Sequence, residues 1–223
     1  MPSDDLLGLL VSARDENGDP LSEQQIRDEV VTMFFAGHET GAAALTWAFY
    51  LLAKHPAVAA ELVQQSDTAC ENKFIDNVMR ETMRLYPPAY RISRTVVETC
   101  ELGGTKIKAG AELGIPQWAV HRSARYYDEP ERFRPERWTE DFVASLPPFA
   151  YFPFGGGPRT CIGNHFGMVE NRFVVSRMLR RFEFQIPDRE PGLHLGVTLL
   201  PQDNSLKLTL RPRSEVRASL VTS

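Results

Sequence analysis

The cysteine at position 161 lies in the glycine-rich segment Phe154-Gly155-Gly156-Gly157-Pro158-Arg159-Thr160-Cys161-Ile162-Gly163, and helical spacing begins directly after it. Successive glycines allow positive φ angles and let the backbone approach a flat ligand closely. A cysteine at a helix N-terminus meets the positive end of the helix dipole, which favours the thiolate over the thiol. The chemistry indicated is a thiolate ligand beside a flat group, and Arg159 offers a planar fork that suits a carboxylate of that group.

This segment has two alternative interpretations. It could be a glycine-rich turn around a buried, inert cysteine, which is the usual environment of a lone cysteine. It could also cradle a phosphate, although it lacks the G-K-[ST] ending and the preceding hydrophobic strand of such loops. The remaining cysteines, Cys70 and Cys100, form no C-x-x-C pair, so the sequence predicts neither a disulfide framework nor a zinc site and favours a reducing, cytoplasmic setting.

A second group of polar residues, Ala36-Gly37-His38-Glu39-Thr40, interrupts an apolar stretch with helical spacing. An acid and a hydroxyl among apolar residues are costly unless they are used or paired. Gly37 leaves room for a small ligand, and the Thr40 hydroxyl can bond a backbone carbonyl and disturb the helix, opening a pocket. The alternative is a solvated polar notch on a long helix.

Charged residues with helical spacing occur in two further places. Glu81 and Arg84 are three residues apart, and such a pair on a surface stabilises a helix by only about 0.2–0.5 kcal/mol. A basic group follows Cys161 and could attract an acidic partner, or could simply be a solvated face. Its members are Arg172, Arg177, Arg180 and Arg181.

Length and composition restrict the class of protein. The chain has 223 residues, of which 43% are hydrophobic and 24% charged, so disordered, collagen-like and disulfide-scaffold proteins are excluded. A net charge of −4 lacks the positive field of a general nucleic-acid binder. The first residues carry Asp4 and Asp5, and the apolar run after them is too short for a signal or membrane anchor.

Periodicity predicts helices on both sides of a β-rich segment. A capping box at Ser22-Glu23-Gln24-Gln25, with Leu21 and Ile26 as a hydrophobic staple, marks the start of a long helix. The predicted elements are a long helix over 22–54, a helix over 73–86, a small antiparallel sheet within 91–116, an irregular region over 122–160, a helix over 161–181 and closing strands within 182–211.

With these motifs assembled, the sequence resembles the cytochrome P-450 family, and more narrowly its soluble bacterial members. The family's haem loop has the pattern F-x-x-G-x-R-x-C-x-G, which residues 154–163 meet at every fixed position. The resemblance implies that Cys161 is the axial thiolate ligand of a haem b iron. It also implies a group of residues at the cofactor: Arg159, Arg94, Phe154, Gly155, Gly163, Gly37 and His121. For His121, an ordinary hydrogen bond elsewhere is the alternative.

The other motifs acquire roles from the same resemblance. Residues 36–40 are similar to the oxygen-activation motif A-G-x-[DE]-T, which implies that Thr40 steadies activated oxygen while Glu39 helps relay protons through water. Gly41 stands where the family often has Thr or Ser. Three residues are implied to form a structural network that holds the haem loop: Glu81 and Arg84 of an E-x-x-R motif and Arg137 of a P-E-R-F segment, in which Trp138 replaces Phe.

The fold class expected is mainly α with small antiparallel β-sheets (α+β), as in the C-terminal half of the family fold. Residues 1–223 are expected to form a single partial domain from which the family's N-terminal half is absent. A connection around residues 66–73 is about ten residues shorter than the family pattern. Apolar helix faces that pack against the missing elements should be exposed.

The function expected is that of a haem-thiolate monooxygenase, which inserts one oxygen atom of O₂ into an apolar small-molecule substrate. The expected partners are an electron donor of the ferredoxin or flavin type, with no nucleic acid and no membrane anchor. A truncated, non-catalytic haem-binding fragment is the first alternative. A peroxide-using or rearranging haem-thiolate enzyme is the second, and the Glu39-Thr40 pair argues against it because such chemistry would not need a proton relay.

Overall fold

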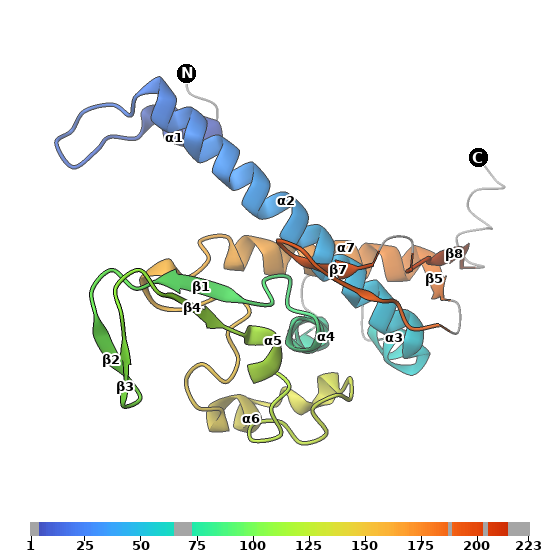
Figure 1. Cartoon of the computed structure of the whole chain (residues 1–223). Coiled ribbons are helices and arrows are strands. Elements are labelled where there is room, and N and C mark those ends of the chain that lie inside the picture. The colour runs from blue at the N-terminus through green and yellow to red at the C-terminus, as the bar shows by residue number, and fades with distance from the viewer. Residues whose placement is uncertain (1–4, 65–72, 187–188, 203–204, 214–223) are drawn as a thin grey trace. The chain divides into compact units, whose positions relative to one another are not determined.

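The computed structural model describes residues 5–64, 73–186, 189–202 and 205–213 (Figure 1). The chain divides into two compact units, Met1–Thr40 and Gly41–Ser223, with the boundary inside the long helix α2 (Glu23–Lys54). The shortened connection predicted around residues 66–73 lies outside the described residues, apart from Lys73, as does Cys70.

The first unit contains α1 (Leu6–Ser12) and the N-terminal part of α2. The predicted capping box begins α2: the Gln25 amide donates to Ser22 Oγ at 3.2 Å, and the Ser22 amide donates to Gln25 Oε1 at 2.8 Å. These bonds satisfy two donors that a helix start would otherwise leave unpaired. Apolar side chains here are exposed, among them Phe34 (64%) and Phe35 (71%), as expected if α2 packs against elements that this chain does not contain.

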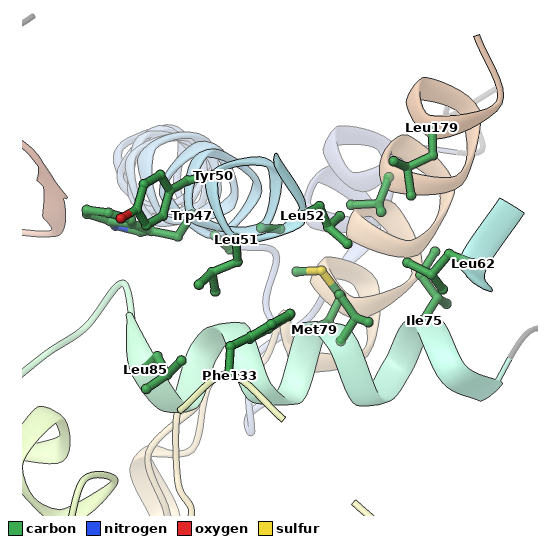
Figure 2. Packing of buried hydrophobic residues seen from close by; sticks show 14 residues of the cluster. Trp47, Tyr50, Leu51, Leu52, Leu62, Ile75, Met79, Leu85, Phe133 and Leu179 are labelled. Atoms are coloured by element: carbon green, nitrogen blue, oxygen red, sulfur yellow. The ribbon is translucent and has the colours of Figure 1, made fainter. Parts of the chain in front are cut away.

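The hydrophobic core belongs to the second unit, where helices converge (Figure 2). The C-terminal half of α2 contributes Trp47, Tyr50, Leu51 and Leu52, and α3 (Pro56–Gln64), α4 (Lys73–Leu85) and α7 (Asn164–Arg181) supply facing side chains. Met79 of α4 and Leu179 of α7 are almost fully buried. This core fixes α4 and α7, the two helices next to the candidate site.

Within the described residues, the strands form four two-stranded antiparallel sheets. The segment over 91–116 gives two of them, and the closing segment the other two. The pairs are β1 (Ile92–Thr95) with β4 (Glu112–Ile115), β2 (Cys100–Leu102) with β3 (Thr105–Ile107), β5 (Phe182–Gln185) with β8 (Thr209–Pro212), and β6 (Leu193–Leu195) with β7 (Leu199–Pro201). The mainly helical α+β class with small antiparallel sheets is therefore confirmed.

Two details of the region before α7 differ from the prediction. The irregular stretch contains a short helix, α6 (Glu140–Ser145), which begins where the Phe142 amide donates to the capping Thr139 hydroxyl. It also contains single 3₁₀ turns, η1 (Pro135–Arg137) and η2 (Gly157–Arg159). The helix predicted from residue 161 begins only at Asn164, because Cys161-Ile162-Gly163 form the turn that enters it.

Candidate functional site

Cys161 is exposed on the loop that leads into α7. Its backbone amide donates to the Phe154 carbonyl at 2.9 Å, which closes the loop, and Gly163 caps the helix. A Cβ atom at Gly163 would lie 3.9 Å from Cys161 Sγ, so this glycine leaves the space beside the sulfur open. The exposed thiol contradicts the alternative of a buried, inert cysteine.

The glycines of the loop have the special conformations that the sequence suggested. Gly155 and Gly157 have φ angles of +73° and +68°, a region that residues with a Cβ enter at a cost. Gly156 faces the ring of Phe149 so closely that a Cβ would overlap the ring. Phe149 itself has a φ of +63°, which is uncommon for a bulky residue and marks strain beside the loop.

Two arginines predicted at the cofactor are exposed on elements close to this loop. Arg159 lies in η2, two residues before Cys161, and Arg94 lies in β1, where its Nη1 donates to the Ser93 carbonyl at 2.8 Å. A Cβ at Gly155 would lie 3.6 Å from Cδ1 of Ile92, so β1 packs against the loop. The second unit therefore brings Arg159, Arg94 and Cys161 into one region.

The surroundings of Cys161 fit a flat, largely apolar group with acidic edges. Large apolar side chains on and beside the loop and in the first turn of α7 are exposed, namely Ile162 (92%), Phe166 (72%) and Phe149 (62%), of which Phe149 lies against Gly156. Exposed apolar side chains gathered at one place mark a binding surface. Haem combines an apolar ring, two propionates and an iron that accepts a thiolate, so these residues suit it.

Glu81 lies at the centre of the predicted structural network, and both of its carboxylate oxygens are used. Oε1 accepts from Arg84 Nη2 at 2.9 Å and from Arg137 Nε at 3.0 Å, and Oε2 accepts from Arg84 Nε at 2.8 Å. The backbone amide of Arg134 and Nε1 of Trp138 donate as well, both at 2.9 Å. Glu81 and Arg84 are fully buried and Arg137 is 7% exposed, so the surface-pair interpretation does not apply.

The two arginines of this network also bind backbone carbonyls of the irregular region. Arg84 Nη1 donates to the His121 and Pro130 carbonyls at 2.9 and 2.5 Å, and Nη2 donates to the Arg132 carbonyl at 3.1 Å. Arg137 Nη1 donates to the Asp128 carbonyl at 2.8 Å. The rigid guanidinium fork therefore ties a chain segment without regular structure to helix α4.

His121 has a different place from the one implied for a cofactor ligand. It is fully buried, and its Nε2 accepts the Phe152 amide at 2.9 Å. Burial lowers the pKa of its imidazole to about 3, so the ring is neutral at physiological pH. These contacts favour the alternative of an ordinary hydrogen bond over contact with a propionate.

The second motif, residues 36–40, lies in the first unit. The Thr40 hydroxyl donates to the Ala36 carbonyl at 2.6 Å, as predicted. The helix nevertheless stays α-helical across these residues, so the expected local disturbance is not seen. A Cβ at Gly37 would meet nothing within 4 Å, and Glu39 is exposed.

Three side chains have contacts that the sequence did not reveal. Trp138, interpreted only as a conservative replacement of Phe, donates its indole N–H to Glu81. Gln117, which carried no motif, is fully buried and donates to the Phe152 carbonyl. Arg172 is held by Asp76, with Nη2 2.7 Å from Oδ1, so it is not available simply as a charge for an acidic partner.

Two further findings concern metals and membranes. Among the described residues, no group of three or more His, Cys, Asp or Glu side chains is arranged to hold a metal ion. No helix in the described part is long and apolar enough to cross a membrane.

Several known proteins are similar to this chain in sequence or in structure. The family model described as cytochrome P-450 matches residues 2–208. Cytochrome P-450 4V2 of Mus musculus is 37% identical, covering 94% of this chain and 42% of that protein. Protein LUTEIN DEFICIENT 5, chloroplastic, of Arabidopsis thaliana is 39% identical, covering 89% of this chain and 36% of that protein. Such relatives do not single out bacterial members of the family.

Solved structures agree with the sequence matches. The retinoic acid-bound cyanobacterial CYP120A1 has a TM-score of 0.89 and 31% identity to this chain, covering 96% of it and 52% of the solved chain. The chain therefore spans about half the length, or less, of the proteins that it matches. The loop, the buried Glu81 network and the family model over residues 2–208 lead to one conclusion: this chain belongs to the cytochrome P-450 family.

Proposed function

We propose that the chain is part of a haem-thiolate monooxygenase that inserts one oxygen atom of O₂ into an apolar organic substrate. The other oxygen atom leaves as water, which consumes two electrons and two protons, and a ferredoxin or flavin-type donor supplies the electrons. The observation that carries the proposal is the exposed Cys161 thiol, on a closed glycine-rich loop with apolar side chains and two arginines around it.

The chain's own residues have separable tasks in this proposal. Haem b, when bound, supplies the binding and reductive cleavage of O₂. Cys161 holds the iron and donates electron density to it, while Arg159 and Arg94 bind the propionates. Phe154, Gly155 and Gly163 shape the loop. Ile162 and Phe166 exclude water from the sulfur side.

The proposed catalytic residues are Thr40 and Glu39 in the first unit. The Thr40 hydroxyl, anchored to the Ala36 carbonyl, has a fixed orientation from which it can hold a proton for oxygen cleavage. Glu39 is exposed and can exchange protons with water. Gly37 lacks a side chain, so the helix surface there can accept a small ligand.

The thiolate assignment is tested by adding haemin to the purified chain, reducing it, and recording the Soret band under carbon monoxide. We expect a red-shifted band of the thiolate type that disappears in Cys161→Ala. Cys100→Ala, at the other exposed cysteine described, is the matched control and should keep the band. Haemin uptake with the same band in Cys161→Ala would refute the assignment.

The role of Thr40 is tested in whatever form of the protein turns over with a ferredoxin or flavodoxin system. Thr40→Ala is expected to uncouple O₂ consumption from product formation, by about 100-fold in product per O₂, the lower end of general acid–base effects. Thr40→Ser keeps the hydroxyl and should retain coupling. Thr46→Ala, which removes a similar hydroxyl-to-carbonyl bond further along α2, is the control. Unchanged product yield in Thr40→Ala would contradict the assigned role.

A truncated, non-catalytic haem-binding fragment is the second candidate. The exposed Phe34 and Phe35 are the observation that favours it. Haemin binding without turnover would support it.

We also infer one partial domain over residues 1–223, since the family model spans the boundary between the two units. A cytoplasmic location stays a prediction, because one relative is named as chloroplastic.

A further inference from the structure

We propose that Gln117 and His121 form a clamp that positions the Cys161 loop by holding both polar backbone groups of Phe152. The two side chains are four residues apart, on and just after the short helix α5 (Gln117–Val120), so they lie on one face of a turn. The inference rests on the proposed function only for its consequence at the haem, because the contacts themselves are present in the chain.

Two side chains bind the two polar backbone groups of Phe152. His121 Nε2 accepts the Phe152 amide at 2.9 Å, and Gln117 Nε2 donates to the Phe152 carbonyl. Both side chains are fully buried, and Phe152 is 8% exposed. A buried backbone group that loses its partner is costly, so the clamp specifies the place of this peptide strongly.

One side of the clamp is attached to the Glu81 network. Arg84 Nη1 donates to the His121 backbone carbonyl at 2.9 Å, so the residue that holds the loop is itself held by helix α4. Figure 1 shows α5 next to α4. Tyr127 and Tyr151 add bonds on the same side, from Tyr127 Oη to the Ala150 carbonyl at 2.9 Å and from Tyr151 Oη to the Arg80 carbonyl at 3.1 Å.

The other side leads to the cysteine. The Phe152 carbonyl also accepts the Gly155 amide at 2.9 Å, and the Phe154 carbonyl accepts the Cys161 amide at 2.9 Å. A shift of Phe152 would therefore move the segment to which the Cys161 amide is bonded. In this arrangement Gln117 and His121 are positioning residues: they do not touch the sulfur, and they fix the backbone that carries it.

The test uses hydrogen exchange of the haem-free chain, so it does not depend on haem binding. In His121→Leu, which removes the acceptor at similar volume, the amides of Phe152, Gly155 and Cys161 should exchange about tenfold faster, as expected for one lost buried hydrogen bond. His121→Gln offers an acceptor near the Nε2 position and should restore much of the protection. Gln117→Met is the second variant, in case His121→Leu does not fold.

The control is Trp47→Phe, which removes a buried bond of Trp47 Nε1 to the Leu199 carbonyl, outside the loop. It should lower protection in the core without a selective effect on the three loop amides. Unchanged exchange of these amides in both His121→Leu and Gln117→Met would overturn the clamp. An equal increase in the exchange rates of the α4 amides and the loop amides would also overturn it, since that would indicate global destabilisation.

A spectroscopic measurement then connects the clamp to the sulfur. After haemin is added, His121→Leu should give a smaller share of the thiolate-type carbon monoxide band than the unsubstituted chain, and His121→Gln a larger share than His121→Leu. If no variant binds haemin, the proposed function fails while the exchange result still decides the clamp. If all bind with equal thiolate share, the clamp does not position Cys161.

Discussion

Glu81→Ala is expected to lower the free energy of unfolding by about 3–5 kcal/mol, a large part of the total stability of a typical domain. The carboxylate accepts five hydrogen bonds, from Arg84 (two), Arg137, Arg134 and Trp138. Removing it leaves the buried guanidinium groups of Arg84 and Arg137 without their counter-charge, and charge burial without a partner is among the most costly changes in a protein. Denaturant unfolding followed by circular dichroism measures the change.

Two comparison variants give this result its meaning. Glu183→Ala breaks the exposed ion pair with Arg213 and should cost less than about 1 kcal/mol. Glu81→Gln keeps the shape of the side chain but removes its charge. Its loss of unfolding free energy should lie between those of Glu183→Ala and Glu81→Ala. A loss below about 1 kcal/mol in Glu81→Ala would show that the network contributes little, because the arginines had found other partners or water.

Acid is expected to destabilise the second unit through His121. Its pKa is about 3 in the folded chain, lowered by burial first and by the charges of Arg84 and Arg122, with the Met83 backbone acting in the opposite direction. The unfolded chain has the ordinary value near 6.5, so it binds the proton first as the pH falls. The stability present above about pH 6.5 is therefore lost progressively toward pH 3. At about pH 4.5 the loss from this residue is about 2–3 kcal/mol.

The measurement is denaturant unfolding at about pH 7 and pH 4.5, in the unsubstituted chain and in His121→Gln. The substituted chain should lose less stability between the two pH values, whatever its stability at pH 7. His55→Gln is the comparison: burial also lowers the pKa of His55, but that ring is only partly buried and its removal should reduce the pH dependence less. Equal pH dependence with and without His121 would mean that the ring is not neutral and buried as described.

Local sequence determined much of the fold. The capping box at Ser22 and Gln25 fixed the start of α2, and His55-Pro56 its end, because caps and prolines act on the backbone within a few residues. The pattern around Cys161 was sufficient to predict the loop and the positive φ angles of Gly155 and Gly157. The predicted start of α7 was wrong by three residues, because a turn and the first turn of a helix have similar sequence patterns.

Local spacing did not decide which polar residues are buried together; tertiary structure did. By spacing alone Glu81 and Arg84 look like a surface pair, and only the family resemblance predicted Arg137 beside them. Packing of the irregular region over α4 excludes water from these residues and adds Trp138. Gln117 carried no signal, and His121 suggested a cofactor contact, because a hydrogen bond to a backbone 31 or 35 residues away leaves no mark in local spacing. The sequence by itself thus determined the loop that carries Cys161, and it predicts a thiolate ligand there. The burial that holds this loop in place follows from long-range packing, in which partners are chosen by proximity in space.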